Sequence, residues 1–257
     1  MQPFSDPYYR RDLATVHHRG FSFHAEACAP GILRLLEPVL EQGGLVLEIG
    51  CGSGLLTTEL IGAGHRVVAT DASPAMLHLA RSTCPDGTDL RLLTLPFDDV
   101  PVADAVVGVG HALNYLADES AVEQALRSMA RAIRPGGILA VDICDLEWGS
   151  ARTAMDSSGR VGDDWAIVTR YASPRPERYV RDLTTFLRNE DGTWRRDDER
   201  HDNVLIDTGR LPALLAAEGV DAEVRSSFGT EQLPIGLRAL VGNRVTDRHG
   251  AAGEARR

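Results

Sequence analysis

Residues 45–54 read LVLEIGCGSG, an aliphatic run around Glu48 followed by glycine at every second position, at Gly50, Gly52 and Gly54. A short aliphatic run that ends in a glycine-rich segment predicts a buried strand, a turn and the start of a helix. Glycines in such a turn let a ligand approach the backbone closely because they carry no Cβ atom. The segment is therefore predicted to bind a ligand at the end of a strand.

Strand and helix patterns alternate on either side of this turn, from about residue 44 to residue 143. Aliphatic runs predict strands at 45–49, 65–71, 90–95, 104–110 and 138–143. Helical patterns lie between them at 54–63, 74–82 and 121–134, and Pro135-Gly136-Gly137 ends the last one. Aliphatic strands without alternation are typical of a parallel sheet covered on both faces. We therefore predict an α/β fold with a doubly wound, mostly parallel, seven-stranded Rossmann-like sheet.

Three segments are expected to surround this core. A helical pattern precedes the first strand, three strand-like runs at 163–173, 178–189 and 193–207 predict an antiparallel lid inserted after the fifth strand, and an αβ unit ends the sheet. The prediction is one domain (1–246) made of an N-terminal helical cap (1–42), a cofactor-binding core (43–147), the lid (148–207) and the last αβ unit with a final strand (208–246), followed by a disordered tail (247–257).

Composition excludes several classes of function. The chain has 37 acidic and 27 basic residues and a formal net charge of -10, without a cluster of five Lys or Arg, so no nucleic-acid partner is predicted. No apolar run reaches the roughly 18 residues of a membrane span, and the start lacks the apolar core of a signal peptide. We expect a cytoplasmic protein without a membrane partner. The sequence leaves the oligomeric state open and is compatible with a homodimer.

The four cysteines, Cys28, Cys51, Cys84 and Cys144, form no CxxC pair and have no histidine at ligand spacing. This pattern argues against a zinc site and against a disulfide framework. They are predicted to be reduced packing residues, and no metal is predicted.

The glycine turn departs from the dinucleotide pattern GxGxxG. Its third glycine, Gly54, comes one residue early, and Leu55 stands where that pattern has glycine. Glu48 lies near the carboxyl end of the strand, where its charge would repel a pyrophosphate and attract an ammonium group. Asp71 ends the second strand, where a carboxylate can accept both hydroxyls of a ribose. An amino acid joined to a nucleoside fits both features, and S-adenosylmethionine contains both.

Four motifs in this order resemble those of class I S-adenosylmethionine-dependent methyltransferases. They are ExGxGxG from Glu48, VVATDASPAML around Asp71, LPFDDVPVADAVV (95–107) and RPGGILAVDI (134–143). The resemblance covers about 100 residues and implies that the glycine backbone packs on the methionine part, that Asp71 binds the ribose and that Ala72 and Met76 flank the adenine. Where the family often has an acid on the third strand, this chain has Leu93, Thr94 and Leu95, so a backbone group or Asp98 is expected to serve. The predicted cofactor-binding residues are Glu48, Gly50, Cys51, Gly52, Ser53, Gly54, Asp71, Ala72, Met76, Leu95, Gly110 and Arg19.

The segment after the fourth strand, VGVGHALNYLAD (107–118), resembles the corresponding stretch of small-molecule N- and O-methyltransferases, including the glycine and aminosugar N-methyltransferases. That resemblance implies an in-line methyl transfer to a nitrogen or oxygen of a small-molecule acceptor, with His111, Asn114 and Tyr115 near the sulfonium. No Asn/Asp-Pro-Pro-Tyr sequence of DNA and protein-amide methylases is present. For His111 two roles stay open: a general base, or a packing residue that donates a hydrogen bond.

The N-terminal stretch YYRRDLATVHHRGFSFHAE (8–26) concentrates aromatic residues and histidines. In the resembling enzymes such a segment closes over the cofactor, which implies acceptor contacts by Tyr9, His18 and His24 and a pair between Arg19 and the methionine carboxylate. The alternative is a helix packed by its phenylalanines, with the polar side chains in water.

A second base candidate lies in the lid. In ERHDN (199–203) a strand places Glu199, His201 and Asn203 on one face. If that face looks into the cleft, His201 is a second catalytic candidate, whereas a solvated lid surface explains the same charges, and we favour the solvated surface.

Two other functions remain as alternatives at this point. One is a nicotinamide-dependent oxidoreductase, against which Glu48 and the early third glycine argue. The other is a protein that binds S-adenosylmethionine without turnover. The sequence does not identify the acceptor.

Overall fold

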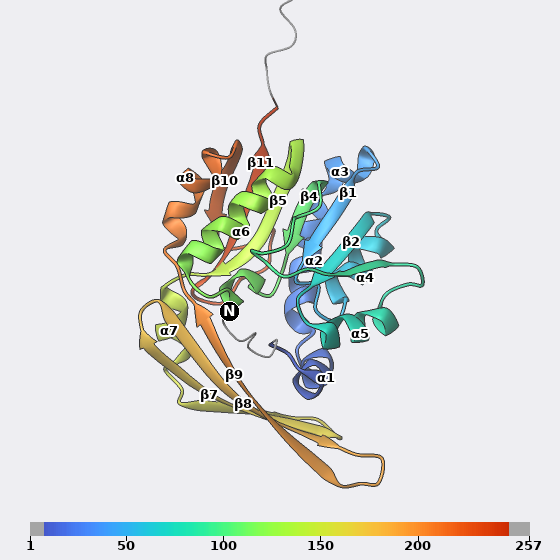
Figure 1. Cartoon of the computed structure of the whole chain (residues 1–257), viewed down its shortest axis with the longest axis vertical. Coiled ribbons are helices and arrows are strands. Elements are labelled where there is room, and N and C mark those ends of the chain that lie inside the picture. Colours follow the sequence, from blue (N-terminus) through green and yellow to red (C-terminus); the bar gives the residue numbers. More distant parts are fainter. Residues whose placement is uncertain (1–7, 247–257) are drawn as a thin grey trace, which may run out of the picture.

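The computed structural model describes residues 8–246, so the predicted tail at 247–257 lies outside the described residues. Seven strands form one sheet in the order β10-β11-β5-β4-β1-β2-β3 (Figure 1). Only β11 runs antiparallel to its neighbours, β10 and β5. The strands are β1 (Leu45–Ile49), β2 (Arg66–Asp71), β3 (Asp89–Leu92), β4 (Ala103–Gly108), β5 (Ile133–Cys144), β10 (Val220–Arg225) and β11 (Leu237–Arg244). The predicted doubly wound, mostly parallel, seven-stranded sheet is confirmed.

Helices cover both faces of this sheet. Adjacent residues of a strand point to opposite faces, so Val46 and Leu47 of β1 enter two different apolar clusters. One cluster packs under α6 (Glu119–Ala132) and α8 (Leu211–Ala216), and the other packs under α2 (Phe23–Leu35), α3 (Glu37–Glu41) and α4 (Leu55–Gly62). Among the α-helices of residues 8–246, two starts are capped by side chains: Ser73 accepts from the Met76 N–H at the start of α5 (Pro74–Thr83), and Asp118 accepts from the Ala121 N–H at the start of α6.

The strand order reverses between β1 and β4. From β1 the chain proceeds to β2 and β3 on one side, and then returns to β4 and β5 on the other. In open α/β sheets the crevice at the carboxyl ends of the strands at such a reversal is the usual ligand site. The glycine turn after β1 therefore lies where the fold itself favours a ligand.

β5 is longer than the sequence predicts. It begins at Ile133, so Pro135-Gly136-Gly137 lies within the strand, and α6 ends at Ala132. A Cβ on Gly137 would lie 2.3 Å from the Asp104 carbonyl oxygen, which makes this a close approach of two backbones. The triplet therefore serves a close backbone contact within β5 as well as the end of α6. From the sequence alone, the same Pro and Gly residues fit either role.

The lid is an antiparallel sheet of four strands, β6 (Ser157–Val161), β7 (Trp165–Arg175), β8 (Arg178–Arg188) and β9 (Trp194–Val204). The three predicted strands are confirmed, but the sequence prediction missed β6. Its residues SSGRV contain one apolar side chain and are largely exposed, so no alternation indicated a strand. The lid projects as a long twisted ribbon from the end of the core at which β5 finishes (Figure 1). The short helix α7 (Glu147–Arg152) leads from β5 into it.

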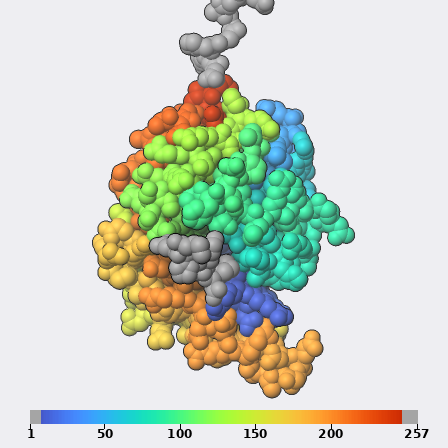
Figure 2. Space-filling view, viewed as in Figure 1, coloured from blue at the N-terminus to red at the C-terminus, as the bar shows by residue number. Residues whose placement is uncertain are grey.

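The N-terminal helix α1 (Arg11–Gly20) packs against the lid. Leu13 and Val16 form an apolar cluster with lid residues, and the Trp165 ring lies so close to Gly20 that a Cβ there would clash with it. An ion pair between Asp12 and Arg195 adds to this contact. Figure 2 shows α1, in blue, lying between the lid and the core.

Candidate cofactor and acceptor site

Three glycines shape the turn after β1, each with a left-handed backbone. Their φ angles are +71° at Gly50, +55° at Gly52 and +85° at Gly54. A Cβ on Gly50 would meet Ala112 Cβ at 2.5 Å, and one on Gly54 would meet Cys84 Sγ at 2.4 Å. A Cβ on Gly52 would meet nothing within 4 Å. Two glycines therefore serve close packing, whereas Gly52 faces open space in which a ligand can lie against the backbone.

Asp71 ties this turn to the next strand. Its carboxylate accepts hydrogen bonds from the Gly52 N–H at 2.8 Å and the Ser73 N–H at 2.7 Å. Burial raises the pKa of Asp71 above its ordinary value, although these backbone hydrogen bonds oppose the rise. Each carboxylate oxygen has a second lone pair, so the side chain can still accept two hydroxyls. Beside it, Ala72 is exposed and Met76 is buried in α5.

Glu48 lies beneath the turn rather than in front of it. The residue is 2% exposed, and its Oε2 accepts a hydrogen bond of 2.6 Å from Thr57 of α4. Burial raises the pKa of Glu48 to about 7, despite the Thr57 hydrogen bond. Its charge near neutral pH is therefore partial, and the electrostatic argument against a pyrophosphate is weaker than the sequence indicated.

The expected adenine side is lined by the loop after β3. Leu95 is buried there, and Asp98 accepts a hydrogen bond of 2.6 Å from the Thr94 N–H. One Asp98 oxygen therefore stabilises the loop itself.

Asp142 organises the opposite side of the crevice. Buried at the end of β5, its carboxylate accepts from the backbone N–H groups of Gly110 and His111, at 2.9 and 2.5 Å, and lies 2.7 Å from His24 Nε2. Burial alone would raise its pKa, but the hydrogen bond and the charge of His24 outweigh burial and lower it. The sequence reasoning missed this residue. A carboxylate inside the aliphatic run ILAVDI was the signal that could have found it.

His111 sits on a backbone of positive φ, +49°, in the loop that follows β4. Its ring stacks on Tyr115, with centroids 5.6 Å apart and planes 8° apart, and lies 5.6 Å from the Trp148 ring. Its Nδ1 is buried and has no hydrogen-bond partner among the described residues. Burial, with the charge of Arg181 second, lowers the pKa of His111 to about 3. The imidazole is therefore neutral near pH 7 and is a weak base.

Asn114, predicted to contact the acceptor, instead joins three parts of the fold. In the 3-10 helix η1 (Ala112–Tyr115), its Nδ2 donates to the carbonyls of Cys144 and Val204, and its Oδ1 accepts from the Cys144 N–H. Both amide donors are used, and the residue is fully buried. Its role in this structure is to hold η1 against β5 and β9.

Tyr9 and Tyr115, both predicted acceptor residues, meet through their hydroxyls at 2.8 Å. Arg181 of β8, which the sequence analysis did not single out, donates from Nη2 to the Tyr115 hydroxyl at 2.5 Å and to His201 Nδ1 at 3.3 Å. The carbonyl of Tyr9 accepts from Ser73 Oγ at 2.8 Å, next to Asp71. The N-terminal segment therefore links the lid to the ribose side of the crevice.

His201 is fully buried and faces this cluster, so the solvated lid surface that we favoured is wrong for this face of β9. Because Arg181 can only donate, Nδ1 of His201 accepts, and Nε2 donates to Glu199 at 3.0 Å. Burial lowers the pKa of His201 to about 4, although Glu199 opposes the shift. With both ring nitrogens bonded to protein, His201 is poorly suited to take a proton from an acceptor.

Of the remaining N-terminal residues predicted to line the site, two lie at the crevice and one does not. His18 Nδ1 lies 2.9 Å from Ser53 Oγ of the glycine turn, and His24 reaches Asp142, so both are at the crevice. Arg19 forms an exposed ion pair with Asp164 of the lid at 2.5 Å. Its guanidinium is thus occupied away from the glycine turn.

The described residues also bear on the predictions about metal ions, cysteines and membrane spans. Within residues 8–246 no group of three or more His, Cys, Asp or Glu side chains is arranged to hold a metal ion. All four cysteines are buried and free, as predicted. In the same part of the chain no helix has the length and hydropathy needed to cross a membrane.

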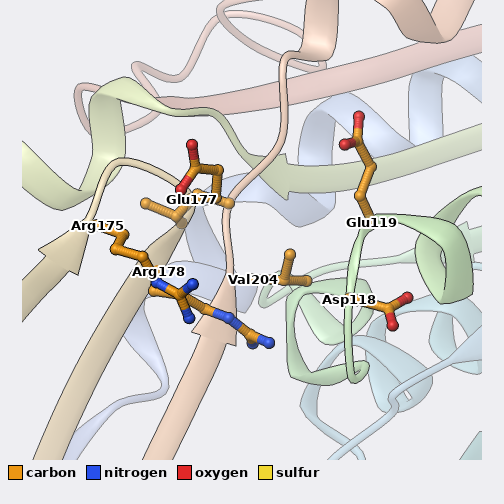
Figure 3. A pocket seen from close by; sticks show the side chains of 7 residues that line it. Asp118, Glu119, Arg175, Glu177, Arg178 and Val204 are labelled. Atoms are coloured by element: carbon orange, nitrogen blue, oxygen red, sulfur yellow. The ribbon is translucent and has the colours of Figure 1, made fainter.

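A cavity of about 260 Å³ lies between the start of α6 and the lid (Figure 3). Arg175, Glu177 and Arg178 from the β7–β8 turn line one side of it, and Asp118 and Glu119 line the other. None of the residues predicted to bind cofactor or acceptor lines this cavity, and its mixed charges are solvated surface.

Known proteins are similar to this chain. The family model described as a methyltransferase domain matches residues 46–137. The chain is 31% identical over 167 residues to the cypemycin N-terminal methyltransferase of Streptomyces sp, covering 60% of this chain and 67% of that protein. It is 33% identical over 150 residues to an uncharacterized methyltransferase of Mycobacterium tuberculosis, covering 55% of this chain and 58% of that protein.

Among solved structures, the sugar N-methyltransferase KedS8 from Streptoalloteichus sp ATCC 53650 matches with a TM-score of 0.72 and 24% identity, covering 95% of this chain and 99% of that one. At this identity the match supports the fold. With the glycine turn, Asp71 and the strand order, these findings define the class: the chain belongs to the S-adenosylmethionine-dependent methyltransferases. It is an enzyme of that family, and neither the nicotinamide-dependent oxidoreductase nor the non-catalytic binding protein finds support.

Proposed function

We propose that this enzyme transfers a methyl group from S-adenosylmethionine to a nitrogen or oxygen of a small molecule. The observation that carries the proposal is the closed arrangement over the glycine turn. Tyr9 of the N-terminal segment contacts Tyr115 and Ser73, and the lid residue Arg181 contacts the same Tyr115. A site covered from two sides suits a small acceptor better than a macromolecular strand.

The residues at the crevice fit the cofactor. Gly52 leaves open space where a Cβ would stand, and a Cβ on Gly110 would also meet nothing within 4 Å. We expect the methionine part against Gly52 and His18, because His18 bonds Ser53 of the turn whereas Arg19 is paired with Asp164. The ribose is assigned to the remaining lone pairs of Asp71. Ala72, Met76 and Leu95 are assigned to the adenine.

When bound, the cofactor supplies an electrophilic methyl group on a sulfonium. The contribution of this chain is to orient the acceptor in line with that methyl group and to exclude water. His111, Tyr115 and Tyr9 are the residues we assign to the acceptor. Because the pKa of His111 is about 3, its proposed task is to accept a hydrogen bond from the attacking group at Nδ1, not to store a proton.

Calorimetry with S-adenosylhomocysteine tests the assignment. The wild type should bind it with micromolar-scale affinity, about 8 kcal/mol. Asp71→Ala should weaken binding at least tenfold, because it removes the ribose acceptor and the bond to the Gly52 N–H. Asp99→Ala, an exposed loop change, is the matched control. Wild-type protein that binds NADH and shows no heat with S-adenosylhomocysteine would overturn the proposal.

A further inference from the structure

Four buried nitrogen atoms without partners belong to one cluster of side chains at the proposed acceptor site. Within residues 8–246, the buried side-chain nitrogens that lack any hydrogen-bond partner are His65 Nδ1, His111 Nδ1, Trp148 Nε1, Arg152 Nε and Arg181 Nε. All except His65 belong to one set of touching side chains. Of these, Trp148 Nε1, Arg152 Nε and Arg181 Nε are donors, and since buried polar atoms are almost always bonded, three unbonded donors in one cluster indicate a missing acceptor.

The contacts between these side chains are direct. The Trp148 ring lies 5.6 Å from the His111 ring, and the Arg152 guanidinium lies 4.1 Å from the Trp148 ring centroid. Tyr115 also stacks on His111, and the Arg181 guanidinium lies 5.8 Å from the Tyr115 ring centroid. Each guanidinium thus contacts an aromatic ring that also contacts His111.

Neither arginine has a carboxylate partner among the described residues. Arg181 uses only Nη2, toward the neutral acceptors Tyr115, His201 and Asn203. For Arg152 the structure gives no hydrogen bond or ion pair within residues 8–246, and its guanidinium contacts the Trp148 ring. Two half-buried cations without counter-charge are costly, which makes an anionic ligand the natural partner.

Two carboxylates near this cluster, Asp142 and Glu199, already have hydrogen-bond partners within the protein. Asp142 holds His24 and two backbone N–H groups, and Glu199 accepts from His201 and from the N–H groups of Tyr9 and Arg10. The two arginines also come from neighbouring elements, since α7 carries Arg152 and contacts β8, which carries Arg181 (Figure 1). Burial raises the pKa of Tyr179, and both arginines oppose that rise, so their charges act on the same place.

We propose that the methyl acceptor carries an oxyanion, a carboxylate or a phosphate, which Arg152 and Arg181 bind while the nucleophile lies at His111. The proposal rests on the proposed methyltransferase function. Because each guanidinium contacts a ring that also contacts His111, the nucleophile and the anion of the proposed acceptor are close together. Guanidinium groups suit both anions, since their forked donors match two oxygens at once.

The test uses full-length protein saturated with S-adenosylhomocysteine and measures the shift of the thermal midpoint with sodium acetate and with inorganic phosphate, against sodium chloride of equal ionic strength. A rise with acetate alone assigns a carboxylate, and a rise with phosphate alone assigns a phosphate. A rise with both assigns a general oxyanion site. No rise beyond chloride with either anion overturns the inference.

Variants locate the effect. Arg152→Gln and Arg181→Gln should each weaken the apparent anion affinity at least tenfold, whereas Arg170→Gln, an exposed arginine of β7, should leave it unchanged. Arg152 has no hydrogen bond to lose within the described residues, so its variant keeps the test valid if Arg181→Gln fails to fold. An anion shift that survives in Arg152→Gln and in a folded Arg181 variant contradicts the inference. A wild type that does not bind S-adenosylhomocysteine would instead reject the methyltransferase function. Failure of the anion inference and failure of the proposed function are therefore distinguishable.

Discussion

His24 and Asp142 lie 2.7 Å apart, although 118 positions separate them in the chain. The pair joins α2 of the N-terminal cap to the carboxyl end of β5. Asp142 also accepts from the N–H groups of Gly110 and His111. One buried carboxylate therefore fixes the cap and the loop that carries the acceptor residues.

This pair predicts a pH dependence of stability. Burial lowers the pKa of His24, but Asp142 outweighs it, so the pKa lies above 6.5 in the folded protein. Between 6.5 and that raised value the native state holds more protons than the unfolded state, and the free energy of unfolding falls as pH rises. His24→Asn should remove about 1 kcal/mol of stability at pH 6 and less at pH 9. Urea unfolding at both pH values measures it, with exposed His78→Asn as control. Equal losses at the two values would contradict this assignment.

Glu48 predicts a second pH dependence, at a lower pH and without a charged partner. Its folded pKa of about 7 exceeds the ordinary value of 4.5, so the native state again holds the extra proton, between pH 4.5 and 7. Stability should therefore fall as pH rises through that interval. Glu48→Gln removes the titration while its amide oxygen can still accept from Thr57. It should stabilise the apoprotein by about 2 kcal/mol at pH 8 and little at pH 5.

Urea unfolding at pH 5 and pH 8 measures this difference. Glu59→Gln, an exposed change on the helix that carries Thr57, should alter stability at neither pH. A Glu48→Gln variant less stable than the wild type at pH 8 would refute the assignment.

Gly52 and Gly43 form a matched pair for cofactor binding. Both have positive φ, +55° and +63°, and a Cβ on either would meet nothing within 4 Å. Alanine at either position should therefore cost a similar backbone strain, about 1 kcal/mol. Only Gly52→Ala places a methyl group where we expect the methionine part. We predict at least tenfold weaker S-adenosylhomocysteine binding for Gly52→Ala and wild-type affinity for Gly43→Ala in calorimetry. Equal affinities of the two variants would contradict the assignment of the methionine part of the cofactor to this turn.

His201 is predicted to stabilise the closed arrangement instead of acting as a base. His201→Ala removes a partner of both Arg181 and Glu199 in a buried cluster, and should cost about 2 kcal/mol. Its neighbour Asp202 is exposed, and its ion pair with Arg178 is long, at 3.5 Å, so Asp202→Asn should change stability by less than about 0.5 kcal/mol. Denaturant unfolding compares them. A stable His201→Ala protein with unchanged protease resistance of residues 8–20 would argue against the structural role.

The sequence by itself determined the cofactor core. In LVLEI and VVATD the aliphatic pattern is local, so it predicted β1 and β2, and the glycines and Asp71 follow at the strand ends where any parallel sheet presents them. The strands at 163–173, 178–189 and 193–207 of the lid were predicted for the same reason, since their alternation and the turn before Thr193 are local patterns. β6 was not, since an exposed short edge strand carries no such pattern.

Only the tertiary structure decided which side chains meet. In the folded protein Glu48 is a buried hydrogen-bond partner of Thr57, Arg19 pairs with Asp164, and Asn114 bonds backbone groups. It also brought Arg181 from the lid to Tyr115 and left its charge without a carboxylate partner among the described residues. These outcomes depend on the packing of cap, sheet and lid against one another, and hydrogen bonding and burial across such distances leave no periodic trace in the chain.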